Sequence, residues 1–255
     1  MFIGGNAGRS NLILCFIYII MRKLCFATGN LWRIMGKVDV VDLISELDVD
    51  GIEYTYGRFY NERIPTEKDF DILRNYNFNS VHAPFRMSLD LMNQDEFEKI
   101  ISLVAIDYKK MGAKNIVVHP TIVLPNKLPN LDFITENLNP MKKPKLRPRL
   151  GFEKILNKNK DWNLCLDASH AYDWGVCETE RIVKKWKHQI KQVHFSNNRY
   201  HKDHLSFEKV SRDFLKSIEP LKELNVPIVI EEDMHYTKVS DIKKEIKRVR
   251  DILSL

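Results

Sequence analysis

Short apolar runs alternate with longer segments of helical periodicity along most of this 255-residue chain. Runs of β-branched and apolar residues that end in polar or turn-forming residues predict buried strands. The predicted strands are residues 23–28, 51–56, 80–83, 115–120, 133–138, 163–167, 190–195 and 227–232. Eight such strands alternating with helices predict a parallel sheet that closes into a (β/α)8 TIM barrel.

Apolar residues at three-and-four spacing predict helices within 97–111, 210–221 and 239–253. Thr66, which precedes acidic residues, and Ser206, which precedes an apolar stripe, are predicted helix starts. The connection between the fourth and fifth strands, residues 121–132, is short and contains two prolines. We therefore expect the helix after strand 4 to be reduced or missing.

Titratable residues stand at or near the carboxyl ends of six predicted strands. They are His82, His119, Glu136, Asp167, His194 and Glu231. Residues two apart share one face of a strand, and the residues two before these six are mostly small or apolar, as the interior of a barrel requires. Active sites of such barrels lie at the carboxyl ends of the strands. Carboxylates mixed with imidazoles indicate a divalent metal, for which zinc, manganese and cobalt are the candidates.

One of these strand ends carries a second imidazole. The run Leu164 to Leu166 ends at Asp167, and His170 is expected in the turn beyond it. A single Asp-x-x-His pair is weak evidence for a ligand pair, but its position beside the other strand ends predicts a place in the same site.

Net charge and cysteine spacing exclude few partners and few cellular compartments. The 40 basic and 34 acidic residues give a net charge of +6, which leaves nucleic acid open as a partner without requiring it. Cys15, Cys25, Cys165 and Cys177 show no Cys-x-x-Cys spacing, so we expect free thiols and a cytoplasmic protein.

The amino-terminal segment is treated separately. The apolar run 12–21 is too short to span a bilayer, so no stable membrane association is expected. We predict that residues 1–20 are an extension outside the fold, with a membrane anchor as the less favoured alternative, and that residues 21–255 form a single barrel domain.

The strand ends together resemble those of the xylose isomerase-like TIM-barrel superfamily, which includes sugar isomerases and epimerases and the endonuclease IV-like AP endonuclease family 2. The resemblance spans roughly residues 22–253. It rests on the segments Ser80-Val81-His82-Ala83-Pro84, Val117-Val118-His119-Pro120, Thr135-Glu136-Asn137, Leu166-Asp167-Ala168-Ser169-His170, Val193-His194-Phe195 and Val229-Ile230-Glu231.

The resemblance implies two ligand sets. In epimerases, a single metal is held by a quartet that falls on Glu136, Asp167, His194 and Glu231. In the nuclease, further histidines complete three zinc sites, and the candidates are His82, His119, His170 and His204. The nuclease pattern near the last of these resembles Asp-x-His, whereas here Asp203 stands directly before His204. Glu53 resembles the second strand of the sugar enzymes and is a possible additional metal or substrate contact.

Three functions follow, in order of preference. The first is a sugar or sugar-phosphate isomerase or epimerase, in which Glu136 and Glu231 exchange protons with the substrate and His170 contacts a substrate oxygen. The stretch 139–149 contains three prolines and is predicted to be an irregular, solvated loop. The second function is a zinc phosphodiesterase acting at abasic sites in DNA, in which this basic stretch would instead bind phosphates. Its charged residues are Lys142, Lys143, Lys145, Arg147 and Arg149. The third is a metal-binding barrel without turnover.

Overall fold

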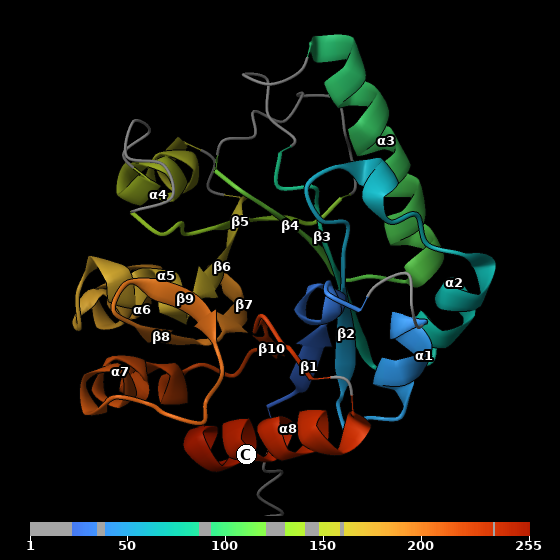
Figure 1. The fold of residues 1–255 in the computed structure, drawn as a ribbon. Coiled ribbons are helices and arrows are strands. Elements are labelled where there is room, and N and C mark those ends of the chain that lie inside the picture. Colours follow the sequence, from blue (N-terminus) through green and yellow to red (C-terminus); the bar gives the residue numbers. More distant parts are fainter. Residues whose placement is uncertain are drawn as a thin grey trace, which may run out of the picture.

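Eight parallel strands close into a barrel in the computed structural model, which describes residues 22–34, 39–86, 93–120, 131–140, 148–158, 161–236 and 238–255. The strands follow one another around the barrel in the order β1-β10-β7-β6-β5-β4-β3-β2 (Figure 1). Their bounds are β1 (Leu24–Ala27), β2 (Gly51–Thr55), β3 (Phe78–His82), β4 (Asn115–Val118), β5 (Phe133–Glu136), β6 (Asn163–Asp167), β7 (Ile190–Phe195) and β10 (Ile228–Ile230). The predicted (β/α)8 barrel is confirmed.

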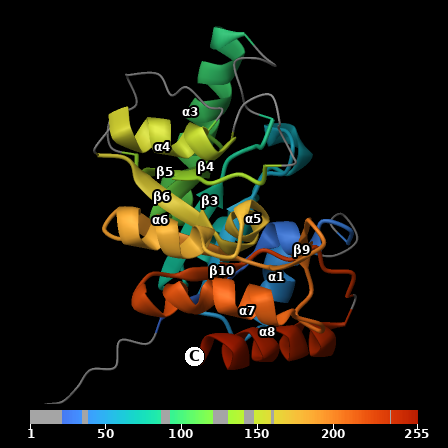
Figure 2. The ribbon, with the colours of Figure 1, turned by 90° about the vertical axis from the view of Figure 1, so that its left-hand side faces the viewer.

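Helices cover the outside of this barrel (Figures 1 and 2). They are α1 (Val40–Ser45), α2 (Glu67–Leu73), α3 (Gln94–Met111), α4 (Pro148–Lys158), α5 (Ala168–Trp174), α6 (Glu178–Trp186), α7 (Arg212–Ile218) and α8 (Val239–Leu253). The described part of the β4–β5 connection, residues 119–120 and 131–132, contains no helix; residues 121–130 lie outside the described range, so the reduced or missing helix there stays a prediction. Among the helices that the structure describes, none combines the length and the hydrophobicity needed to cross a bilayer.

Helix starts were predicted with mixed success. Thr66 is the N-cap of α2, where its side chain accepts a hydrogen bond from the backbone N–H of Asp69 in a capping box. The prediction for Ser206 is wrong, because α7 begins at Arg212 and Ser211 caps it. The side chain of Asn197 donates to the carbonyls of Ser206 and Lys209, so residues 206–209 are held as a loop.

The barrel interior is filled by the alternate residues of its strands. Val117, Ile134 and Cys165 form one buried cluster, and each stands two residues before His119, Glu136 or Asp167. Another cluster contains Cys25, Ala27, Phe78 and Val229. A packed interior leaves ligands only the carboxyl end of the barrel, where the strand-end side chains emerge.

A short hairpin stands above this end of the barrel. Strands β8 (Asn197–Arg199) and β9 (Lys202–Leu205) pair antiparallel after β7, and Figure 2 shows β9 lying beside α5. Residues 1–21 lie outside the described range, so the predicted extension and the single-domain boundary stay predictions.

Candidate metal centre

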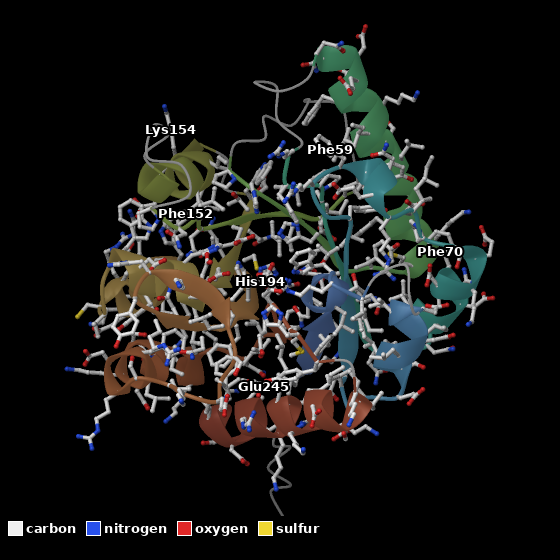
Figure 3. The ribbon with its side chains drawn as sticks, in the orientation of Figure 1. Phe59, Phe70, Phe152, Lys154, His194 and Glu245 are labelled. Carbon is white, nitrogen blue, oxygen red and sulfur yellow. The ribbon has the colours of Figure 1, made fainter. Side chains whose placement is uncertain are left out.

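Four of the predicted residues meet where strands β5, β6, β7 and β10 end. Glu136, Asp167, His194 and Glu231 each place one ligand atom within 4.8 Å of those of the other three, and we call them the quartet. His194 Nδ1 lies 2.9 Å from Glu231 Oε2 and 3.8 Å from Glu136 Oε2. His194 stands near the middle of the ring of strands (Figure 3), and only Glu231 keeps appreciable exposure.

Three polar atoms of the quartet are buried without a hydrogen bond of acceptable geometry. They are Asp167 Oδ2, His194 Nδ1 and Glu231 Oε2, and their close neighbours are other charged groups of the site: His194 Nδ1 and Glu231 Oε2 lie 2.9 Å apart, and Asp167 Oδ2 lies 3.4 Å from His170 Nδ1. Buried polar atoms almost always have a partner. A divalent cation would satisfy all three atoms, and three carboxylates with one imidazole are a ligand set that zinc, manganese or cobalt accepts. The residues present therefore fit a bound metal.

A second group adjoins the quartet at Glu136. His82 Nε2 lies 3.3 Å and His119 Nε2 3.6 Å from Glu136 Oε2, and the three side chains form another candidate ligand set. His82 Nδ1 lies 2.8 Å from the carbonyl oxygen of Ala83. Because a proton on Nδ1 makes that hydrogen bond, Nε2 is the nitrogen that would give up its proton and bind a metal.

The third group consists of His170 in the first turn of α5 and Asp203 and His204 in β9. His170 was expected in a turn after the strand, but α5 follows Asp167 directly. Asp203 Oδ2 lies 3.2 Å from His170 Nε2 and 3.7 Å from His204 Nε2. The Nδ1 atoms lie 2.9 Å and 2.7 Å from the carbonyl oxygens of Asn137 and Glu231, so both Nε2 atoms are directed toward the carboxylate.

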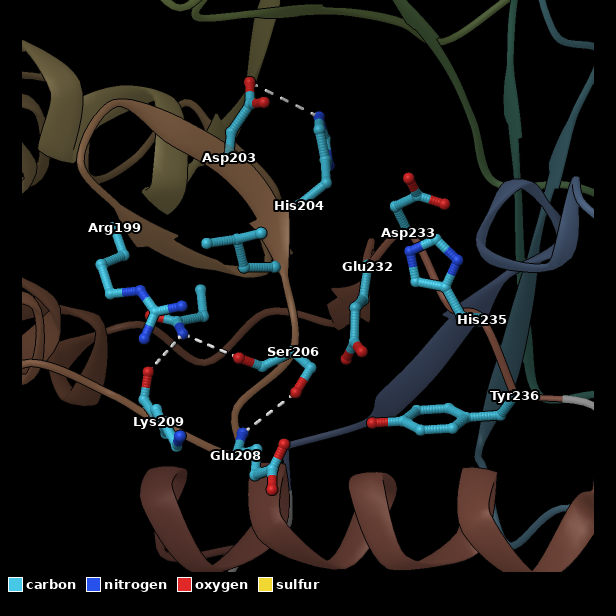
Figure 4. A pocket seen from close by; sticks show the side chains of 12 residues that line it. Arg199, Asp203, His204, Ser206, Glu208, Lys209, Glu232, Asp233, His235 and Tyr236 are labelled. Atoms are coloured by element: carbon cyan, nitrogen blue, oxygen red, sulfur yellow. Dashed lines mark hydrogen bonds and ion pairs between the residues drawn. The ribbon is translucent and has the colours of Figure 1, made fainter.

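Asp203 was not among the predicted ligands, and the backbone explains why. Neighbouring residues of an extended strand point to opposite sides, so Asp203 and His204 should not face one partner. His204, however, has a φ of +55°, which is left-handed. Figure 4 shows the two side chains turned toward each other above a hollow of about 400 Å³ between β9 and the loop after β10.

The three groups lie next to one another, and residues from different groups also form a further possible ligand set. His82 also lies within ligand distance of His194 and Glu231, so ligands of different groups are close enough to be shared.

Burial and neighbouring charged groups shift the pKa values of the side chains in this cluster. Burial alone would raise the pKa of Glu136, but hydrogen bonds with His170 and His82 outweigh burial and hold that pKa well below its usual range. Burial lowers the pKa of His82, yet the Glu136 carboxylate raises it to about 9. Burial raises the pKa of Asp167 to about 6. A metal that binds here must displace protons from imidazoles, so binding releases protons.

Solved structures share this fold, while no family model and no curated protein matches the chain. A D-tagatose 3-epimerase-like protein superposes with a TM-score of 0.60 at 18% identity, covering 91% of this chain and 98% of its own. AP endonuclease, family 2 from Brucella melitensis gives 0.62 at 13% identity, with 86% and 96% covered. A xylose isomerase domain containing protein from Salmonella typhimurium gives 0.64 at 12%, with 92% and 98% covered.

The chain has the xylose isomerase-like TIM-barrel fold. Its structural neighbours include epimerases and an AP endonuclease, so the fold alone leaves both predicted reactions open.

Two further predictions for this xylose isomerase-like barrel concern Glu53 and the basic stretch within 139–149. Glu53 joins none of the ligand groups found among the described residues, and it lies fully buried inside the barrel, in contact with His194 Nε2. Most of the basic stretch, residues 141–147, lies outside the described range, and the side chain of Arg149, in α4, is not described. The phosphate-binding role of Lys142, Lys143, Lys145, Arg147 and Arg149 stays a prediction.

Proposed function

We propose that this protein is a divalent-metal-dependent phosphodiesterase that cleaves DNA at abasic sites. The observation that carries the proposal is the presence of three adjoining ligand groups instead of the quartet alone. An epimerase that holds a single metal at the quartet would leave five further candidate ligands without a metal-binding role. Phosphodiester cleavage uses neighbouring ions, because attacking and leaving oxygens both need stabilisation. The geometry therefore reverses the order of preference that the sequence suggested.

Glu136 belongs to both the quartet and the group with His82 and His119, so it would be the ligand that these two groups share. Its Oε2 faces His82 and His119, while its Oε1 lies 3.0 Å from His170 Nδ1, the nitrogen that keeps its proton. Bound divalent ions would supply Lewis acidity for the phosphate and lower the pKa of a coordinated water. The protein itself holds the imidazoles in fixed tautomers, through Nδ1 hydrogen bonds of His82, His170 and His204 to backbone carbonyls.

Loops at the same end of the barrel pair exposed aromatic rings with arginines. Arg33 lies 4.5 Å from the ring centroid of Trp32, which is 54% exposed, and Arg86 lies 5.7 Å from that of Phe59. Aromatic rings stack on nucleobases, and arginines contact phosphates. Phe85, in the loop after β3, brings this surface up to the ligand groups, since its ring stacks at 6.1 Å on that of His119.

A hollow between these loops has a volume of about 470 Å³ and is lined in part by Trp32, Tyr56, Arg58 and Phe85. Aromatic walls beside an arginine offer a surface on which a nucleobase can stack. This surface supports DNA as the substrate class.

The test is cleavage of a duplex that carries one abasic-site analogue, with zinc or manganese present. We expect a metal-dependent single-strand break at the abasic position, no cleavage of the undamaged duplex, and no cleavage by Glu136→Gln. Glu178→Gln, which alters a buried carboxylate on α6 that pairs with Arg181, is the matched control and should cleave normally. Absence of cleavage under all metal conditions would refute the proposal.

Metal stoichiometry provides a second measurement. One ion in each of the three groups predicts up to three ions per chain, measured by atomic emission on protein purified without added metal. A single ion per chain, held with high affinity at saturating zinc, would contradict the polynuclear site.

The quartet by itself supports a second candidate, a sugar isomerase or epimerase, because Glu136 and Glu231 both reach the same point from different strands. Moving a proton between two faces of a carbon requires two positioned groups. In that case Glu136→Gln should abolish the exchange of the substrate C–H hydrogen with deuterated water. Exchange on a panel of ketoses, combined with one ion per chain, would favour this candidate over the nuclease.

A further inference from the structure

A buried carboxylate lies inside the barrel directly beneath the quartet. Glu53, on β2, has no exposed surface, and its Oε2 accepts hydrogen bonds from Ser80 Oγ at 2.9 Å and Gln192 Nε2 at 2.5 Å. The same oxygen lies 3.1 Å from His194 Nε2. Asn115 in turn donates to Gln192 Oε1 at 2.9 Å, so the amide nitrogen of Gln192 is fixed toward Glu53 Oε2 and also lies 3.0 Å from His194 Nε2.

The two nitrogens of His194 therefore face different environments. Nδ1 points toward Glu231 and Glu136, and Nε2 points toward Glu53. A nitrogen that binds a metal carries no proton, so in a metal-bound imidazole the other nitrogen carries it. With the metal at Nδ1, the proton is on Nε2 and is donated to the carboxylate of Glu53.

A purely structural role explains this arrangement poorly. A carboxylate is expensive to bury, by several kcal/mol in proteins, even when hydrogen bonds surround it. Glu53 Oε1 has no hydrogen bond of acceptable geometry, and it too lies 3.1 Å from His194 Nε2, so both carboxylate oxygens face the imidazole. A neutral amide could accept the bonds from Ser80 and Gln192, whereas only the carboxylate increases the electron density of an imidazole that donates to it.

We propose that Glu53 is a positioning residue that holds His194 with its proton on Nε2 and presents Nδ1 as a strong metal ligand. The proposal rests on the metal centre of the proposed function but not on the reaction carried out there. It places the site's affinity for metal under the control of a residue that never contacts the metal or the substrate.

The test is Glu53→Gln, which keeps the shape of the side chain and removes its charge. Zinc affinity, measured by competition with a chelating dye and without any substrate, should fall about 10- to 100-fold. Glu178→Gln should leave the affinity unchanged, although it also neutralises a buried carboxylate. Equal affinities in wild type and Glu53→Gln, or equal losses in both variants, would overturn the proposal.

A spectroscopic measurement on wild-type protein covers the case in which Glu53→Gln does not fold. In zinc-loaded protein with ¹⁵N-labelled histidine, the long-range ¹H–¹⁵N spectrum should show His194 protonated at Nε2, with a proton that exchanges slowly. Metal at Nε2 instead would refute the geometry on which the proposal depends. Ser80→Ala, which removes one donor to Glu53 but no charge, should weaken zinc binding less than Glu53→Gln does.

The test of Glu53 and the test of the nuclease can succeed or fail independently. Loss of zinc affinity in Glu53→Gln, together with no cleavage of abasic DNA by the wild type, would support the positioning role and reject the nuclease. Cleavage of that DNA with unaltered zinc affinity in Glu53→Gln would do the opposite.

Discussion

Neutralising Asp167 should stabilise the metal-free protein, although it removes a proposed metal ligand. Asp167 is fully buried, its Oδ2 has no hydrogen bond, and its Oδ1 accepts from the backbone N–H of His170 as the N-cap of α5. Asparagine caps helices about as well as aspartate does. Asp167→Asn therefore keeps the cap and removes a buried negative charge.

The size of the effect follows from the pKa. Burial raises the pKa of Asp167 from 3.8 to about 6, so the folded state binds this proton more tightly than the unfolded chain does. Stability from this group is complete below the unfolded pKa and is lost as the pH rises through the folded pKa. A difference of roughly two pKa units corresponds to about 2–3 kcal/mol. Asp167→Asn avoids this loss and should be more stable by about that amount at pH 7.5.

The assay is urea denaturation with a chelator present, at pH 7.5 and at pH 4.5. Because Asp167 of the folded wild type is protonated at pH 4.5, the advantage of the variant should shrink to about 1 kcal/mol there. Zinc should largely cancel the advantage of the variant at pH 7.5. A 100-fold excess over Kd stabilises the wild type by about 2.7 kcal/mol, whereas a variant that binds 100-fold more weakly gains only about 0.4 kcal/mol.

A matched control changes another buried aspartate. Asp107 accepts hydrogen bonds from the hydroxyls of Tyr56 and Tyr60, at 2.6 Å and 2.9 Å, so Asp107→Asn should destabilise the protein at neutral pH. If metal-free Asp167→Asn proved less stable than the wild type at pH 7.5, or if its advantage did not depend on pH, the assignment of an unsatisfied charge to this position would be wrong.

Three further outcomes are expected from other parts of the molecule. His119→Ala should lower the metal content by one ion, as measured by atomic emission, while the quartet keeps its ion; an unchanged content would remove His119 from the ligands. Gly51→Ala should destabilise the barrel by about 1–3 kcal/mol in urea denaturation, because its Cβ would lie 2.2 Å from the carbonyl oxygen of Phe78. Tyr56→Phe should lose about 1 kcal/mol by the same assay, since Asp107 keeps its bond from Tyr60. If neither Gly51→Ala nor Tyr56→Phe lost stability, the packing around these residues would be more adaptable than the structure indicates.

Much of the barrel could be predicted from sequence, since its signals are local. Each strand is an apolar run closed by a polar residue, and all eight predicted strands overlap the observed ones, as with 163–167 and 190–195. The strand-end residues were predicted to meet for a general reason, because parallel strands in a barrel present their carboxyl ends to one point. That geometry brings Glu136, Asp167, His194 and Glu231 together.

The features that could not be predicted depend on contacts distant in sequence. The start of α7 at Arg212 instead of Ser206 follows from hydrogen bonds that Asn197 makes. Glu53 contacts Ser80, which is 27 residues away in the sequence, and His194, which is 141 residues away. Helix α4 begins at Pro148, within a stretch that composition alone predicted as irregular up to Arg149. A proline suits the first turn of a helix, but only the surrounding packing decides that a helix forms.

The left-handed backbone at His204 has a consequence for the evolution of this site. A φ of +55° costs a residue with a Cβ about 1–2 kcal/mol, which glycine would avoid. Selection for stability alone would thus favour glycine at position 204, and selection for the third ligand group would favour histidine. Position 204 should therefore separate variants of this barrel into two kinds, and a glycine there would identify a barrel that has become more stable by giving up that group.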